Sequence, residues 1–335
     1  MERIYILGNS RSGTTMTARI IGNIPEYLEL TEYHYFERYI DLCSSMDELT
    51  FDQGLEIVSE MLSIYYEGYI SQRNSKTKYY KEAREILKSK TFDPITLHMA
   101  ILDYLANKND CLGYVEQTPN NLLHYSQVLK VEKSKMVALI RDPRFVLRSQ
   151  KKKWKRSRLG AHKFSSFETV RSFLNYNPWL TALQWKINAQ KLTRILDEVG
   201  PDKIFLIKFE NLLNESKKTI KELCSFLQAD YHDDLLNIPQ IGSSYSSDEP
   251  SKKGIKATVN LPIDFSSRVI SSAVRMICGR ELRIYGYESR FFLDLSLISI
   301  VLYLVILPIQ LLIIFALNFA RTRNIFLSIK NRLKS

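Results

Sequence analysis

The feature that most constrains the fold is a strand, a glycine loop and a helix at the start of the chain. Residues 3–7 (Arg-Ile-Tyr-Ile-Leu) form a short apolar run rich in β-branched and aromatic side chains, which is typical of a buried strand. Residues 16–21 have a helical pattern, and the loop between holds Gly8 and Gly13. Such a loop points backbone N–H groups and a helix N-terminus at a bound phosphate. The sequence therefore predicts an α/β fold with an anion site near its start.

This loop differs at one position from the nucleotide-binding pattern G-x-x-x-x-G-K-S/T. Gly8 and Gly13 have the required spacing, but Thr14 stands where the pattern has lysine. That lysine reaches the β- and γ-phosphates of a nucleoside triphosphate, so its absence argues against an NTPase. The cation lies three residues earlier, at Arg11, and such a loop can hold a single phosphate beside a charged group. A glycine-rich turn without a ligand is the simpler alternative.

A second strand and turn carries another arginine. Residues 136–140 (Met-Val-Ala-Leu-Ile) predict a buried strand, and Arg141-Asp142-Pro143 follows directly. Ser149 stands eight residues after Arg141. An arginine at a strand end can bind a phosphate as a bidentate fork, which lysine does less well. The alternative is a strand-to-helix turn with a local ion pair.

Together, these two segments resemble the signatures of the sulfotransferases that use 3′-phosphoadenylyl sulfate (PAPS), in their bacterial-type, carbohydrate and tyrosylprotein branch. The first resembles the family's 5′-phosphosulfate loop, and the second resembles its 3′-phosphate site. The resemblance covers roughly residues 3–288 and implies a three-layer, P-loop-like fold, with PAPS as donor and ligands at the carboxyl ends of a parallel sheet. It implies donor binding by Arg11, Ser12, Gly13, Thr14, Thr15, Arg141 and Ser149.

The segment after the first helix carries a candidate general base. Glu32-Tyr33-His34-Tyr35-Phe36 resembles a Glu-Thr-His-Phe-Phe segment of bacterial-type and tyrosylprotein enzymes, in which the glutamate is the base. An attacking hydroxyl loses its proton, and a carboxylate within hydrogen-bond reach can take it. We therefore expect Glu32 and Arg11 to be catalytic, with His34 as an alternative base. A surface role for Glu32 is the simpler alternative.

A further carboxylate follows the predicted strand at residues 111–115. Glu116-Gln117-Thr118-Pro119 resembles the Glu-Lys-Thr-Pro segment of carbohydrate sulfotransferases, which lies beside the acceptor. In those enzymes the lysine faces the donor's sulfate, and here Gln117 replaces it. Glu116 is a second alternative base. Thr118 and Pro119 predict a helix start, with Thr118 as N-cap.

Charge and cysteine placement narrow the class of protein further. The net charge is +11, but eight Lys/Arg lie in residues 148–163 and five in residues 321–334, with no acid in either stretch. We interpret the first stretch as a basic rim that steers an anionic donor or acceptor or faces a membrane, or as a solvated loop, rather than a nucleic-acid site. The four cysteines are scattered without a C-x-x-C, and the histidines form no ligand cluster, so we expect no metal.

The C-terminal part has a different composition. Residues 295–320 are 26 residues without a charge, enough to cross a bilayer as a helix. This stretch predicts either a spanning helix kinked at Pro308 or an interfacial hairpin. The first residues form a core strand without a signal peptide, so we expect a cytoplasmic catalytic domain. The positive-inside tendency then favours the hairpin.

These features predict a domain organisation and a reaction. We expect a sulfotransferase domain at 1–288 with a helical insertion at about 41–109, a hydrophobic membrane-associated segment at 291–320 and a basic tail at 321–335. The expected reaction moves a sulfuryl group from PAPS to a hydroxyl of a carbohydrate or lipid-linked acceptor at the membrane. The alternatives are a P-loop kinase-like phosphotransferase and a non-catalytic, membrane-tethered nucleotide-binding protein.

Overall fold

The structure is a computed structural model in which the chain divides into two compact units. It describes residues 1–30, 32–68, 77–88, 91–152, 158–159, 162–163, 166–240, 249–255, 265–287 and 297–318. The first unit comprises residues 1–140, 194–240 and 249–257, and the second comprises 141–193, 241–248 and 258–335. The predicted boundary at residue 288 stays a prediction.

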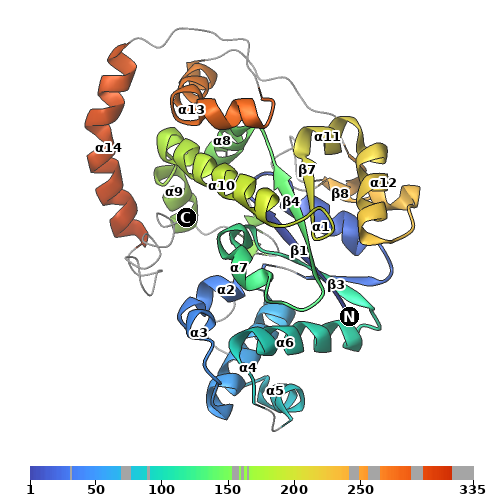
Figure 1. The fold of residues 1–335 in the computed structure, drawn as a ribbon. Helices are drawn as coiled ribbons and strands as arrows, with labels where there is room; N and C mark the ends of the chain where they lie inside the picture. Colours follow the sequence, from blue (N-terminus) through green and yellow to red (C-terminus); the bar gives the residue numbers. More distant parts are fainter. Residues whose placement is uncertain are drawn as a thin grey trace. The chain divides into compact units, whose positions relative to one another are not determined.

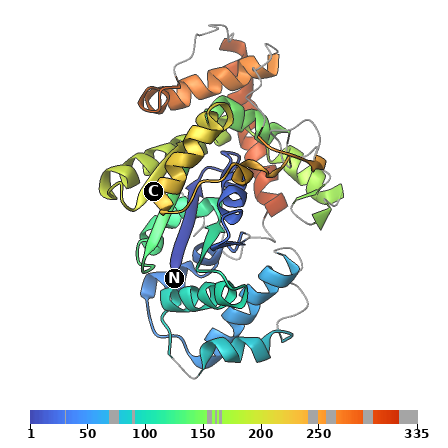
Figure 2. The ribbon, with the colours of Figure 1, turned by 90° about the vertical axis from the view of Figure 1, so that its right-hand side faces the viewer.

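A five-stranded parallel sheet forms the centre of the first unit (Figures 1 and 2). Its strand order is β2-β3-β1-β4-β7. The strands are β1 (Glu2–Gly8), β2 (Tyr27–Leu30), β3 (Gly113–Gln117), β4 (Ser134–Ile140) and β7 (Ile204–Lys208). The predicted α/β fold with a parallel sheet flanked by helices is therefore confirmed.

Helices cover both faces of this sheet, and alternate side chains of each strand point to opposite sides and are buried on each. On one face, Ile4 and Ile6 pack into a core with α1 (Thr14–Gly22), α11 (Phe209–Asn214) and α12 (Ser216–Leu227). On the other face, the Tyr5 ring lies 6.0 Å from His98 of α6 (Pro94–Lys108) and 6.3 Å from Phe36 of α2 (Tyr35–Arg38).

The segment 41–109 is largely helical where the structure describes it. It contains most of α3 (Ile40–Ser45), then α4 (Phe51–Glu67), α5 (Tyr80–Leu87) and α6, which gather below the sheet in both views. Local sequence explains where two of these helices begin. Thr50 forms a capping box with Gln53, and Asp93 caps α6 ahead of Pro94.

Short elements complete the first unit. After β3 the chain forms the 3-10 helix η1 (Pro119–His124) and α7 (Tyr125–Val128). A further 3-10 helix, η3 (Asp233–Leu236), precedes the small ribbon of β8 (Pro239–Gln240) and β9 (Glu249–Lys253).

The second unit is mainly helical. It contains α8 (Pro143–Lys151), α9 (Ser166–Leu174), most of α10 (Pro178–Glu198), α13 (Phe265–Ile284) and α14 (Leu297–Asn318), with a short ribbon of β5 (Arg158–Leu159) and β6 (His162–Lys163). Gln190 of α10 donates a 2.6 Å hydrogen bond to buried Glu281 of α13. This bond joins two helices in the interior of the unit.

The C-terminal segment forms one helix rather than a hairpin. Helix α14 continues through Pro308, and the structure describes its side chains at 305 and 307–317. Across the parts of the chain that the structure describes, no helix has the combined length and apolar character of a membrane span, so the predicted span is not supported. The basic tail at 321–335 lies outside the described residues.

Candidate active site

The loop after β1 has the backbone of an anion-binding cradle. Arg11 and Gly13 adopt left-handed conformations, with φ of 76° and 95°. Gly13 caps α1 without a side-chain hydrogen bond, and the first turn of α1 holds no acidic residue. The first amide groups of a helix have no partner within the helix, so they are available to an anion. A Cβ atom at Gly13 would collide with the ring of Phe209, which explains the glycine.

One buried hydroxyl in this loop fits a bound oxyanion. Ser12 is fully buried, and its Oγ has no hydrogen-bond partner within the described part of the chain. A buried hydroxyl without a partner is unfavourable unless a ligand satisfies it. The Ser12 hydroxyl, the uncapped helix start and Arg11 therefore fit a phosphate group.

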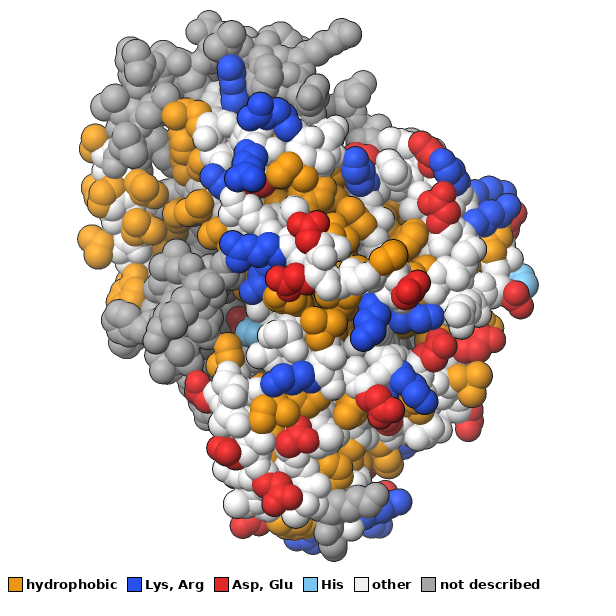
Figure 3. All heavy atoms as spheres, in the orientation of Figure 1, with side chains coloured by type: hydrophobic (Ala, Val, Ile, Leu, Met, Phe, Trp, Pro, Cys, Tyr) orange, Lys and Arg blue, Asp and Glu red, His pale blue; other side chains and the backbone are white. Residues whose placement is uncertain are grey.

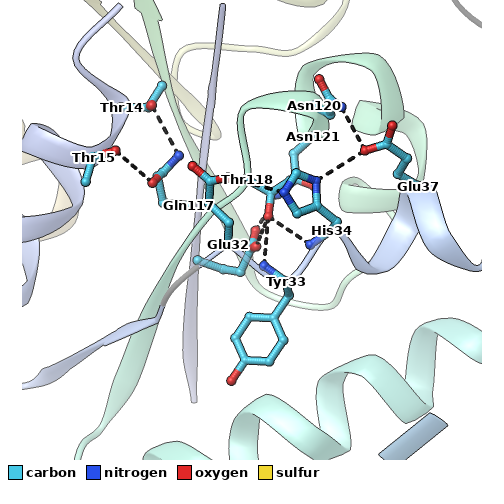
Figure 4. A network of polar contacts seen from close by, with 11 residues as sticks. Thr14, Thr15, Glu32, Tyr33, His34, Glu37, Gln117, Thr118, Asn120 and Asn121 are labelled. Atoms are coloured by element: carbon cyan, nitrogen blue, oxygen red, sulfur yellow. Dashed lines mark hydrogen bonds and ion pairs between the residues drawn. The ribbon is translucent and has the colours of Figure 1, made fainter. Parts of the chain in front are cut away.

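Gln117 holds the end of this loop from the neighbouring strand. Its Nε2 donates to Thr14 Oγ1 at 3.2 Å, and its Oε1 accepts from Thr15 Oγ1 at 3.1 Å (Figure 4). The amide side chain is almost fully buried, so these two bonds satisfy it away from solvent. Sequence comparison marked Gln117 only as a missing lysine and did not reveal this contact.

A histidine between two carboxylates lies on the other side of β3 (Figure 4). His34 Nε2 is 3.2 Å from Glu32 Oε2, and His34 Nδ1 is 3.2 Å from Glu37 Oε2. Asn120 donates a 2.7 Å hydrogen bond to the same Glu37 oxygen. Glu37 is thereby fixed, and it fixes the imidazole ring in turn. Neither Glu37 nor Asn120 was among the predicted site residues.

The chemistry of these contacts distinguishes the two candidate bases. An ionised carboxylate only accepts hydrogen bonds, so both contacts of His34 are hydrogen bonds only when each ring nitrogen carries a proton. In that arrangement His34 has no lone pair for an acceptor proton, whereas Glu32 does. The Glu32 side chain is 45% exposed, so an acceptor hydroxyl can reach it.

Glu116, the third candidate, lies beneath this cluster and supports it. Thr118 Oγ1 accepts from the backbone N–H groups of Tyr33 and His34, each at 3.2 Å, and donates to Glu116. Asn121 donates to the other Glu116 oxygen. Burial raises the pKa of Glu116 from 4.5 to about 7, although the bonds from Thr118 and Asn121 oppose the shift. Both carboxylate oxygens are thus engaged, one of them through Thr118 with the loop that carries His34.

Thr118 is the N-cap residue of η1, as predicted, but it does not cap the helix with its side chain. Helix η1 does begin after Thr118, with Pro119 as its first residue, but the Thr118 side chain makes no capping hydrogen bond. Its hydroxyl instead contacts the backbone of Tyr33 and His34, which are distant in sequence. Proline at the first helical position needs no N–H partner, so the hydroxyl can be used elsewhere.

The second predicted donor segment belongs to the second unit. Trp185 Nε1 donates a 2.9 Å hydrogen bond to the Arg141 carbonyl, and the Arg141 guanidinium lies 5.7 Å from the centre of the Phe145 ring. Asp142 caps α8 and pairs with Arg144, which is the local ion pair considered from the sequence. Ser149 is buried on α8. A joint donor site with residues 8–15 stays a prediction.

Comparison with known proteins agrees with these observations. A family model described as the sulfotransferase family matches residues 3–233. The sulfotransferase domain of the Synechococcus PCC 7002 olefin synthase has a TM-score of 0.53 and 15% identity, with 86% of this chain and 96% of that chain covered. This likeness shows a shared fold.

Two further sulfotransferase structures match at lower TM-scores. One, from Mycobacterium avium, has a TM-score of 0.44 and 12% identity over 84% of this chain and 76% of that one. The other, from Alicyclobacillus acidocaldarius, has a TM-score of 0.42 and 14% identity over 85% and 99%. No curated protein sequence matches the chain. Because the family model covers well over half of its length, the chain belongs to the sulfotransferase family and is a sulfotransferase enzyme.

Proposed function

We propose that the protein transfers a sulfuryl group from PAPS to a hydroxyl group, with Glu32 as the general base. One observation carries this proposal. The cradle at residues 8–15 and the carboxylate cluster around His34 are held by consecutive residues of one strand, Gln117 and Glu116. An anion site and a proton acceptor supported in this way meet the two needs of a group transfer from a phosphosulfate to a hydroxyl.

In this proposal the donor is bound by groups from both predicted segments. Arg11, the Ser12 hydroxyl and the first amides of α1 bind the 5′-phosphate, while Arg141 and Ser149 bind the 3′-phosphate. During transfer the acceptor oxygen bonds to sulfur, and the sulfur–oxygen bond to the 5′-phosphate breaks with its electrons staying on that phosphate. Arg11 and the amides stabilise this developing charge. The acceptor proton moves to Glu32.

The test of the base compares two variants of the full chain. Glu32→Gln keeps the shape of the side chain but cannot take a proton, so we expect turnover to fall by about 10² or more. Binding of adenosine 3′,5′-bisphosphate, followed by calorimetry, should stay unchanged. His34→Asn is the matched comparison. Full turnover in Glu32→Gln, with loss of turnover in His34→Asn, would assign the base to His34.

A separate experiment tests the donor. Arg141→Ala should weaken binding of adenosine 3′,5′-bisphosphate about tenfold or more, because a charge-assisted bidentate contact is lost. Ser12→Ala should weaken it less, by one neutral hydrogen bond. If calorimetry of the unaltered protein gave no heat with this nucleotide, the donor assignment would be refuted whatever the base.

We further propose that the acceptor is a hydroxyl of a carbohydrate or lipid-linked molecule at a membrane, with the catalytic domain in the cytoplasm. The support is the uncharged stretch at 295–320. Membranes incubated with radiolabelled donor should carry label in the lipid or polysaccharide fraction. Label confined to small soluble metabolites would contradict this acceptor class.

A further inference from the structure

Helix α14 exposes apolar side chains in the part where its side chains are described, at 305 and 307–317. Val305, Ile309 and Leu312 are 65%, 60% and 71% exposed, and they follow one another at helical spacing. Residues 297–318 contain no charged side chain. Figure 3 shows a group of hydrophobic side chains at the left of the view, where Figure 1 draws α14. A helix without a polar face is ordinarily covered by a large core or by lipid.

Gln310 ties α14 to other residues of the second unit through hydrogen bonds. Gln310 Nε2 donates to the carbonyl oxygens of Tyr176 at 2.8 Å and Leu174 at 3.2 Å. Its Oε1 accepts from Asn177 Nδ2 at 2.9 Å, and Asn177 is buried. Both ends of the amide are therefore used, and the rotation of α14 about its axis is fixed at this point.

The fixed rotation turns the apolar side outward. At about 100° per residue, Val305 and Leu312 lie on the side of α14 roughly opposite Gln310. Gln310, the polar residue at the middle of the helix, thus has hydrogen-bond partners. The residues on the opposite side of the helix are apolar.

Helix α9, which contacts α14, also exposes large apolar side chains. Phe167 and Val170 are 58% and 54% exposed and are three residues apart, on one side of the helix. Two touching helices of one unit therefore each present apolar residues to the surroundings. Isolated exposed apolar residues are ordinary, but a concentration on neighbouring helices marks an interaction surface.

We infer that α9 and α14 together form a surface that binds an anionic lipid bilayer, with α14 lying in the plane of the interface. An in-plane helix needs an apolar side toward the acyl chains and a satisfied side away from them. On α14, the side that faces away from the acyl chains is held by the hydrogen bonds of Gln310 and carries no charged residues. Charge supports the choice of lipid, because five Lys/Arg and no acid follow α14 in residues 321–334. Basic residues next to an apolar helix are attracted to anionic headgroups.

The test is flotation of the full-length protein with phosphatidylcholine vesicles that contain or lack phosphatidylglycerol. The double variant Val305→Glu/Leu312→Glu should lower binding by about tenfold or more, because two apolar contacts with lipid are replaced by charges. Leu112→Glu is the matched control, since Leu112 is 70% exposed but belongs to the first unit. It should bind like the unaltered protein.

Three more variants test the parts of the inference separately. Phe167→Glu/Val170→Glu should also weaken binding, whereas full binding would show that α9 takes no part. Arg321→Gln and Arg323→Gln should each lower binding to vesicles with phosphatidylglycerol roughly fivefold, and change binding to pure phosphatidylcholine little.

Other outcomes would overturn the inference. If the Val305→Glu/Leu312→Glu protein keeps its circular dichroism spectrum and full vesicle binding, α14 is not the lipid surface. If the unaltered protein does not float but is a dimer that this variant converts to a monomer, the surface binds a second copy instead. Because vesicle binding needs no turnover, these results do not depend on the proposed reaction.

Discussion

Replacing Glu116 by glutamine should make the stability of the protein respond differently to pH. Glu116 is 2% exposed and has a pKa raised from 4.5 to about 7. A raised carboxyl pKa means that folding disfavours the ionised form. The contribution of the protonated Glu116 carboxyl to stability is fully present below the unfolded pKa of 4.5 and is lost as pH rises through 7. Glutamine has no such charge, so the variant should not show this loss.

The size of the effect follows from the shift. Relative to a protein with Glu116 protonated in both states, the raised pKa lowers the free energy of unfolding by about 1 kcal/mol at about pH 5 and by about 3 kcal/mol at about pH 9. The free energy of unfolding of Glu116→Gln, relative to the unaltered protein, should therefore rise by roughly 2–3 kcal/mol across this range. A glutamine can still accept from Thr118 and donate to Asn121 if the Asn121 amide turns its oxygen inward.

Urea unfolding followed by far-ultraviolet circular dichroism measures this difference at each pH. Tryptophan fluorescence is less suitable, because Trp179 and Trp185 belong to the second unit and Glu116 to the first. Glu116→Ala is the comparison that separates charge from hydrogen bonding. It removes the same charge but leaves Thr118 and Asn121 without their partner, so it should be less stable than Glu116→Gln at every pH. A constant difference between Glu116→Gln and the unaltered protein from pH 5 to 9 would refute the reasoning.

Three other substitutions, one of them with a matched control, test the backbone, the hydrogen bonds and the packing of the first unit. Gly13→Ala should destabilise the protein by about 2 kcal/mol or more in thermal unfolding, since φ is +95° and a Cβ would meet an aromatic ring. Gly200→Ala is the control, because open space surrounds Gly200, and it should be nearly neutral. Gln117→Leu should weaken binding of adenosine 3′,5′-bisphosphate about tenfold in calorimetry, because the donor loop loses its two braces. His98 is buried, and its pKa is lowered to about 3, so the protein should lose stability as pH falls below 6.5. In urea titrations, His98→Leu should therefore lack roughly 2–3 kcal/mol of the decrease in unfolding free energy between about pH 7 and 4.5.

Local sequence patterns were sufficient to predict β1 and β4, the strands that lead into the two predicted donor-binding segments. The apolar runs before Gly8 and Arg141 are long and uninterrupted because β1 and β4 are buried on both faces in the middle of the sheet. Strand β2 was not predicted, since it is a four-residue edge strand with polar Glu29 inside it. Edge strands are short and less apolar, so their periodicity is weak.

These patterns could not predict contacts between residues that are far apart in the sequence. Gln117 lies about a hundred positions from Thr14, and Thr118 lies 84 positions from His34. These contacts therefore form only through the pairing of strands. The same holds for α14, whose composition indicated a membrane segment, while its docking depends on a bond between Gln310 and Asn177, 133 positions apart. Composition gives the character of a segment, and the fold decides what that segment contacts.

The order of strands explains why β3 supports both parts of the proposed site. In the sheet, β3 lies between β2, which leads to the loop with Glu32, and β1, which leads to the loop with Arg11. Because the three strands are parallel, both loops leave the sheet beside the end of β3. Successive side chains of a strand point to opposite sides, so Glu116 and Gln117 cannot serve the same loop. Changes at Glu116 should consequently act on turnover through the base loop, and changes at Gln117 on donor affinity. Equal effects of both on the two quantities would show that the loops are not held independently.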